Sequence, residues 1–337
     1  MMYRYIYFFL ILTSCSFFQK KEQKTEIQKL SEMISADPQN IDLLYKRVSY
    51  NNERNNLESA LYDLKEIVKL DSLSFINHNN IAKVYFELSK TKRRDPSFPK
   101  LVRYHLEKSI KLNSNNVEAF ALLGELMLAY YKYEDAIKLF NSSLKINYNQ
   151  ERVHMLMGYA FKEIGVIDNA IDCFRNSLNV NPDFFEVHMQ LGQIFHSLGD
   201  STALIYYNNA LKLNPNDEMV LYNKALFFQE KKDWNNALET YSQLHIVNPF
   251  HVNGHYNLGF IHMELKLYDI ATNNFSDAIY SNSEFYEAYY SRGICFETLG
   301  NIAQAESDYK RSIEINADYL YAIEALKNLK EKNIKYN

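Results

Sequence analysis

Glycine recurs in this chain at an interval of 34 residues, and this interval limits what the chain can fold into. Gly124, Gly158 and Gly192 are 34 residues apart, as are Gly259 and Gly293, and 67 residues separate Gly192 from Gly259. Alanine keeps the same interval at Ala136, Ala170, Ala203, Ala237, Ala271 and Ala305. An aromatic residue follows each of these alanines four positions later. A period of about 20–50 residues is typical of stacked repeats, so we expect one elongated array rather than two globular domains.

Each period is predicted to form a pair of helices, called helix A and helix B below. Apolar residues recur at i, i+3, i+4 and i+7, as in amphipathic helices. In the period 151–184 we expect helix A over about 152–164 and helix B over about 168–180. Gly158 then lies inside helix A, where glycine costs about 1 kcal/mol relative to alanine. We interpret it as the place where helix B approaches closely, and Pro182 as the end of helix B.

A 34-residue unit with these marks resembles the tetratricopeptide repeat. The segment GHYNLGFIHMELKLYDIATNNFSDAI (254–279) carries the family's Leu-Gly pair at Leu258 and Gly259. Ala271, Phe275 and Ala278 follow at the family's spacing. The resemblance implies an all-α fold, a right-handed superhelical solenoid of about eight helix-turn-helix repeats with a C-terminal capping helix. The repeats are 41–74, 75–116, 117–150, 151–184, 185–217, 218–251, 252–285 and 286–319.

Residues 24–40 are predicted to form an N-terminal half-repeat helix, and 320–337 a capping helix and tail. The repeat 75–116 carries eight extra residues, which we assign to a basic loop, KTKRRDPSFP, at 90–99. Such an insertion is where a repeat protein often carries specificity. The loop's candidates for binding phosphate, anionic lipid or an acidic partner are Lys92, Arg93 and Arg94; the alternative is a solvated loop without a binding role.

The first residues resemble the signal peptide of a bacterial lipoprotein. An apolar run over 5–12 is too short for a membrane-spanning helix, which needs about 20 residues. It ends in Leu-Thr-Ser-Cys, similar to a lipobox. The resemblance implies removal of 1–14, acylation of Cys15 and a tether over 15–23. Two alternatives remain open, an uncleaved anchor and an ordinary signal with an incidental cysteine.

The expected location is the cell envelope, with a lipid anchor in the outer membrane. The non-acidic Ser16 after the cysteine goes with outer-membrane sorting in many Gram-negative bacteria. The polar stretch QKKEQKTE (19–26) is similar to surface-export tags of Bacteroidetes lipoproteins. Lipid attachment would make the membrane one partner of the chain.

Enzyme chemistry is not indicated by the sequence. A net charge of −4 does not favour nucleic acid as a partner. The residues outside the repeats are too few for a catalytic domain, and no nucleotide-binding, hydrolase or zinc motif is present. Cys173 and Cys295 fall in different repeats and are predicted to be buried. His251 and His255 have a spacing that allows metal binding, but His255 fills the family's Trp position and should face the core. We therefore expect no cofactor, no metal and no small-molecule substrate.

In the tetratricopeptide family the inner groove is lined by the second, fifth, sixth, ninth, twelfth and thirteenth positions of helix A. Tyrosine fills the fifth position in three successive repeats, and amides fill much of the sixth. The Lys and Asn pair by which chaperone-binding members hold a terminal carboxylate is absent. We expect an extended peptide as ligand, held by tyrosine surface and amide hydrogen bonds. The candidate contacts are Tyr222, Asn223, Tyr256, Asn257, Tyr290, Tyr159, Gln193, Lys83 and Asn80.

The function predicted from these observations is a non-enzymatic, membrane-tethered scaffold or adaptor that binds another protein through this groove. Two other functions remain open. One is the substrate-binding subunit of an envelope enzyme complex, and the other is a soluble or secreted tetratricopeptide protein. We also expect Tyr256→Ala to weaken partner binding while behaving in stability like a surface substitution.

Overall fold

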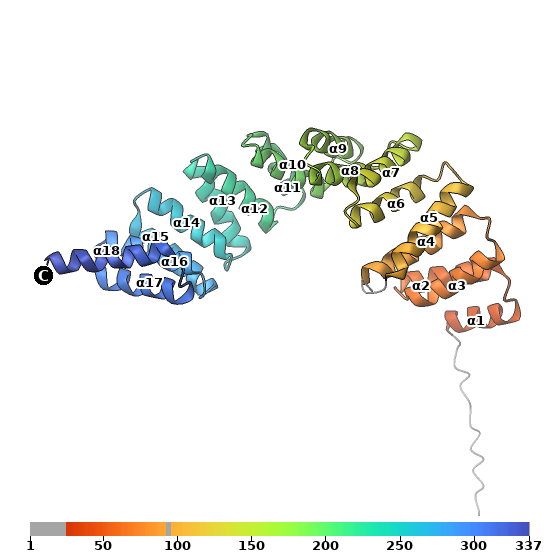
Figure 1. The fold of residues 1–337 in the computed structure, drawn as a ribbon, viewed down its shortest axis with the longest axis horizontal. Coiled ribbons are helices and arrows are strands. Elements are labelled where there is room, and N and C mark those ends of the chain that lie inside the picture. The colour runs from red at the N-terminus through yellow and green to blue at the C-terminus, as the bar shows by residue number, and fades with distance from the viewer. Residues whose placement is uncertain (1–24, 92–95, 337) are drawn as a thin grey trace, which may run out of the picture. The chain divides into compact units, whose positions relative to one another are not determined.

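The computed structural model describes residues 25–91 and 96–336, and within them it contains eighteen helices and no strand (Figure 1). The chain divides into two compact blocks. The N-terminal block ends at Leu126 and the C-terminal block begins at Met127. No helix in the described ranges is both long and apolar enough to cross a membrane.

The helices of the N-terminal block are α1 (Glu26–Ala36), α2 (Ile41–Glu53), α3 (Leu57–Leu70), α4 (Phe75–Thr91) and α5 (Ser97–Leu112). Helix α6 (Val117–Ala129) contains the boundary between the blocks. The C-terminal block continues with α7 (Tyr133–Ile146), α8 (Glu151–Glu163), α9 (Ile167–Val180), α10 (Phe185–Ser197), α11 (Thr202–Leu213), α12 (Glu218–Glu230), α13 (Trp234–Val247), α14 (Val252–Glu264), α15 (Tyr268–Ser281), α16 (Tyr286–Thr298), α17 (Ile302–Ile315) and α18 (Leu320–Tyr336).

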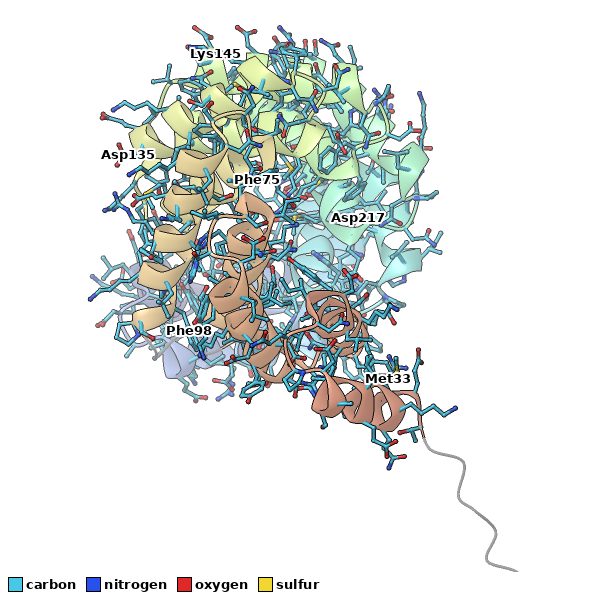
Figure 2. All side chains as sticks on the ribbon, turned by 90° about the vertical axis from the view of Figure 1, so that its right-hand side faces the viewer. Met33, Phe75, Phe98, Asp135, Lys145 and Asp217 are labelled. Atoms are coloured by element: carbon cyan, nitrogen blue, oxygen red, sulfur yellow. The ribbon has the colours of Figure 1, made fainter. Side chains whose placement is uncertain are left out.

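Short polar signals set the ends of these helices. Thr25 and Gln28 form a reciprocal capping box at the start of α1. Asp217, at the start of α12 in Figure 2, accepts a hydrogen bond from the backbone N–H of Val220 at 3.0 Å. Between helices A and B, one residue takes a left-handed φ of 54° to 80° in every repeat whose turn is described. These residues are Asn55, Tyr131, Gly165, Gly199, Lys232, Lys266 and Gly300.

Helices α1 to α5 each pack on the next one along the chain, and so do helices α7 to α18. Two pairs of successive A helices in the C-terminal block also touch, namely α10 with α12 and α14 with α16. The expected role of the repeat glycines is confirmed. A Cβ added at Gly158 would lie 2.8 Å from the Phe174 ring, and one at Gly192 would lie 2.6 Å from the Tyr207 ring. Because the side chain of glycine is a single hydrogen atom, helix B can pack closely against helix A at these positions.

Histidine fills the same core position in four repeats and ties the preceding connection to helix A. Nε2 of each ring donates to the carbonyl oxygen of the residue six positions earlier, at 2.8–3.1 Å. The rings are buried. These histidines are His78, His154, His188 and His255. His255 therefore faces the core, as expected from its position.

The sequence predicts a loop over 90–99 in the repeat 75–116, but the structure does not form a loop over the whole of this range. Helix α4 runs to Thr91 and α5 begins at Ser97. Part of the insertion thus lengthens the two helices, to 17 and 16 residues. Proline at residue 99 is compatible with this, because the first turn of a helix needs no N–H donor there. Lys92, Arg93 and Arg94 lie outside the described residues.

The same kind of ion pair, between helix A and helix B of one repeat, occurs in two repeats. Arg47 donates to both carboxylate oxygens of Asp63, at 2.8 and 2.6 Å. Arg292 does the same to Asp308, at 2.8 Å for both bonds. In each case the guanidinium also reaches a serine of the preceding helix B, Ser276 in the second case. One arginine thereby links three consecutive helices.

Candidate functional site

Three tyrosines at the fifth position of successive A helices form a row in the C-terminal block, called the tyrosine row below. Tyr222 lies on α12, Tyr256 on α14 and Tyr290 on α16, and each is half-buried. The hydroxyl of Tyr256 lies 3.3 Å from Oγ of Ser291, which is the sixth residue of the next helix A. Nδ2 of Asn257 points back to Oη of Tyr222 at 3.5 Å. Polar contacts thus run from the fifth position of one repeat to the sixth position of the next.

The asparagine candidates are predicted to bind a peptide through their amides. In the structure, two of these amides are already bonded within the protein. Asn257 is 8% exposed, and its Nδ2 donates to Oη of Tyr241 at 2.8 Å. In the N-terminal block, Nδ2 of Asn80 donates to Oη of Tyr45 at 3.3 Å. Both amides hold neighbouring repeats together. Asn223 is half-buried and makes no side-chain hydrogen bond within the described ranges.

Tyr256 is more deeply packed than a surface residue. Its ring centroid lies 5.5 Å from that of Phe275, in the core of its own repeat, and 5.0 Å from that of Phe285. Removing this ring opens space against a buried aromatic, which costs stability. This packing contradicts the expectation that Tyr256→Ala would behave in stability like a surface substitution.

Two of the three ninth-position candidates, Tyr159 and Lys83, contact the neighbouring helix A. Oη of Tyr159 donates to Glu186 Oε1 at 3.1 Å, and burial raises the pKa of Tyr159. In the N-terminal block, Nζ of Lys83 pairs with Glu118 Oε1 at 2.5 Å. Gln193 is half-buried on α10. Tyr159 and Lys83 are thus engaged in contacts between repeats.

A group that the sequence reasoning missed stands at the end of the tyrosine row. Tyr319 and Tyr321, at the start of the capping helix, join Tyr290, with ring centroids 5.4 and 6.2 Å from it. Tyr286 lies 4.8 Å from Tyr319. Burial, and then the neighbouring groups, raise the pKa of Tyr319 to about 12. In the sequence, the run DYLYA (318–322) indicates this cluster, but it lies across the end of the last predicted repeat at residue 319.

The remaining candidates are thiols and the N-terminal cysteine. Cys173 and Cys295 are buried as expected, and burial raises the pKa of each to about 12. Both thiols therefore stay protonated at neutral pH. Within the described residues, no group of three or more His, Cys, Asp or Glu side chains is placed to hold a metal ion. Cys15, with the whole of 1–24, lies outside the described residues.

Comparison with known proteins identifies the repeat. Residues 286–319 match one family model described as a tetratricopeptide repeat, and residues 185–217 match another with the same description. No curated protein matches the chain. One similar solved structure, from a functional characterisation of Pseudomonas aeruginosa pilF, is 19% identical over 62% of this chain and 92% of that one, with a TM-score of 0.52.

Another similar structure is MamA (41–end) from Desulfovibrio magneticus RS-1, which is 18% identical over 52% of this chain and 95% of that one, with a TM-score of 0.46. At such identities a structural likeness speaks for the fold alone. The all-α fold and the two matched segments agree: the chain is built of paired helices similar to those of tetratricopeptide-repeat proteins, and 185–217 and 286–319 are its matched repeats.

Proposed function

We propose that the protein is a non-enzymatic, membrane-tethered scaffold that binds an extended segment of another protein along the tyrosine row. The observation that carries this proposal is the half-exposure of Tyr222, Tyr256 and Tyr290 at one position of three successive A helices. Tyrosine offers a large contact area with only two side-chain torsions to restrict, so its surface is suited to binding.

The spacing of the row suits an extended chain. Packed helices lie about 8–10 Å apart, and an extended chain advances about 3.3 Å per residue. A segment running across the A helices would therefore advance by roughly three residues from one tyrosine to the next. Since Asn257 and Asn80 are engaged within the protein, tyrosine surface rather than an amide ladder supplies most of the recognition.

The binding half of this proposal is tested by site-specific photo-crosslinking in native membranes. A benzophenone amino acid is placed at Tyr222 or Tyr290 in the row, or at Tyr280 on α15 as the control. Tyr280 is 81% exposed and belongs to a helix B. We expect one protein to cross-link from both row positions and not from the control. Equal cross-linking from Tyr280 would refute the row as the binding surface.

The membrane half rests on the lipobox-like sequence and places a lipid on Cys15, with 15–23 as tether and the outer membrane as location. Labelled fatty acid should enter the wild-type chain and not Cys15→Ala. Incorporation into both proteins would contradict lipidation at this cysteine. This assay measures lipid attachment alone, so its outcome does not affect the interpretation of the cross-linking experiment.

A further inference from the structure

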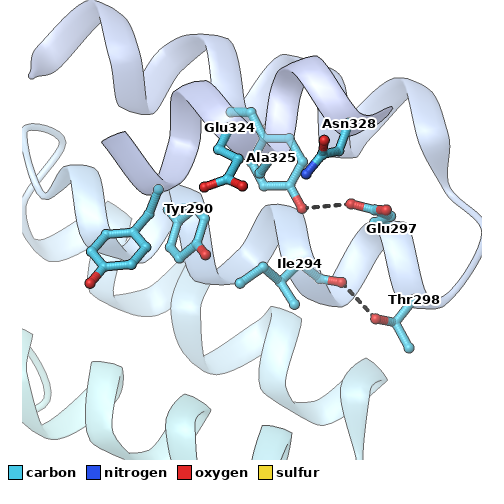
Figure 3. Close-up of a pocket in the computed structure, with 9 residues that line it drawn as sticks. Tyr290, Ile294, Glu297, Thr298, Glu324, Ala325 and Asn328 are labelled. Carbon is cyan, nitrogen blue, oxygen red and sulfur yellow. Dashed lines mark hydrogen bonds between the residues drawn. The ribbon is translucent and has the colours of Figure 1, made fainter. Parts of the chain in front are cut away.

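A cavity of about 520 Å³ lies between α16 and α18, at the end of the tyrosine row. In Figure 3, Glu324 and Asn328 of α18 face Tyr290, Ile294 and Glu297 of α16. Tyr290 is at once the last member of the row and a wall of this cavity. A segment bound along the row therefore reaches the cavity without leaving the A-helix surface.

Helix α18 keeps the register of a helix A, although it was predicted only as a solvated cap. Counting from Leu320 as the first position, Tyr321 is second, Glu324 fifth, Ala325 sixth and Asn328 ninth. All four line the cavity, and they are the positions that face the groove in this family. The fifth position thus carries tyrosine on α12, α14 and α16, and glutamate on α18.

The cavity is acidic. Glu297 Oε2 accepts a hydrogen bond from Tyr309 Oη at 2.9 Å, which orients this carboxylate at the cavity wall. Glu324 is exposed on the opposite wall and has no ion-pair or hydrogen-bond partner within the described ranges. No lysine, arginine or histidine is among the residues that line the cavity. The nearest basic residue in the sequence of α18 is Lys327, which is not part of the lining.

Aromatic rings supply the remaining walls. The ring centroids of Tyr290 and Tyr321 lie 6.2 Å apart, with an angle of 44° between the ring planes. Tyr309 also borders the cavity. The face of a tyrosine ring is electron-rich and attracts cations. Burial, and then the neighbouring Tyr321 and Glu324, raise the pKa of Tyr290. The burial part of this shift disfavours any charge, whereas the part from the Glu324 carboxylate disfavours only a negative charge and would attract a cation.

We propose that this cavity binds the cationic head of an arginine or lysine side chain carried by the segment that occupies the tyrosine row. The inference rests on the proposed function, since the basic residue belongs to that segment. An anionic group would meet two carboxylates, whereas a guanidinium or ammonium gains charge-assisted hydrogen bonds and contact with the ring faces.

The test uses the full-length chain in detergent, with 3-fluorotyrosine placed at position 290 and observed by fluorine NMR. The probe is the peptide acetyl-Gly-Arg-Gly-amide, compared with its citrulline analogue, which has the same shape and no charge. We expect a saturable shift with arginine, and binding at least about tenfold tighter than with citrulline. Acetyl-Gly-Lys-Gly-amide should also bind.

Two matched variants locate the effect. Glu324→Gln removes one exposed carboxylate of the cavity and should weaken arginine binding about fivefold. Asp277→Asn makes the same change in net charge on an exposed position of α15 and should leave it unchanged. Equal binding of arginine and citrulline, or equal effects of the two variants, would overturn the proposal. The titration needs no partner protein, so its failure would leave the cross-linking test of the row untouched.

Discussion

The contact between Gly192 and Tyr207 permits a sharp test of why glycine recurs in this chain. A Cβ at residue 192 would lie 2.6 Å from Cε1 and 2.7 Å from Cδ1 of Tyr207. The ring is fully buried, and its Oη contacts Nδ1 of His196 at 3.1 Å. The ring therefore has little room to move, and Gly192→Ala must push helices α10 and α11 apart.

Two effects of opposite sign set the size of the change. Overpacking a close contact costs about 1–3 kcal/mol. Replacing glycine by alanine inside a helix gains about 1 kcal/mol. We expect Gly192→Ala to lower the free energy of unfolding by up to about 2 kcal/mol, as the difference between these two effects.

A double-mutant cycle separates them. In a Tyr207→Val background the ring atoms that would meet the new Cβ are gone, so only the gain in helix propensity remains. Gly192→Ala should then stabilise by about 1 kcal/mol, which gives a coupling energy of about 1–3 kcal/mol between the two sites. The sign of the alanine effect should thus reverse with the partner residue.

The assay is hydrogen exchange of the α10 and α11 amides, because a repeat array opens locally and a single melting temperature averages over many repeats. Changes in protection of these amides give the local opening free energy in each of the four proteins. The same alanine effect in both backgrounds would refute ring contact as the reason for glycine at this position.

Three further predictions concern stability. Lys266→Gly should stabilise by about 0.5–1 kcal/mol, because a left-handed φ of 62° is strained for lysine; urea unfolding that shows a loss instead would contradict this. Asp308→Asn should destabilise by roughly 3 kcal/mol, because Arg292 loses its counter-charge in a mostly buried site, and Arg292→Met in the same protein should recover part of the loss in circular dichroism melts. Burial, and then the adjacent His78, lower the pKa of His105 to about 4 from 6.5. The unfolded chain binds a proton there that the folded chain excludes, so stability is complete above pH 6.5 and falls toward pH 4; urea midpoints at pH 7 and 4.5 should differ less in His105→Leu.

The repeat pattern carried enough information to predict the fold. Glycine spacing placed Gly158 inside a helix, and α8 and α9 lie within one residue of the limits expected for that repeat. Packing requirements explain this success, since a residue that must fit against Phe174 can vary little from repeat to repeat. The path of the insertion in 75–116 was harder to predict, because extra residues can extend helices as readily as they form a loop.

The site was predicted less well, because the sequence shows which side chains occupy a position but not what they already contact. Asn257 has the right chemistry for a peptide backbone, yet its Nδ2 is used by Tyr241. A single sequence gives no sign of this hydrogen bond, which joins residues 16 positions apart on different helices. Tyr321 and Glu324 are a different case, because they lie beyond the eight predicted repeats, the last of which ends at residue 319.

Binding capacity should concentrate where the tyrosine row meets α18. Inside the array, the fifth and sixth positions of neighbouring helices satisfy each other, as Tyr256 and Ser291 do. Helix α18 follows the repeat 286–319 in the place of a further helix A. Its fifth residue, Glu324, is exposed beside Tyr290 and Tyr321 and has no ion-pair or hydrogen-bond partner among the described residues. A partner segment lying along the row would then be fixed in position at this end, by one basic side chain, while the tyrosines upstream contribute contact area that tolerates many sequences.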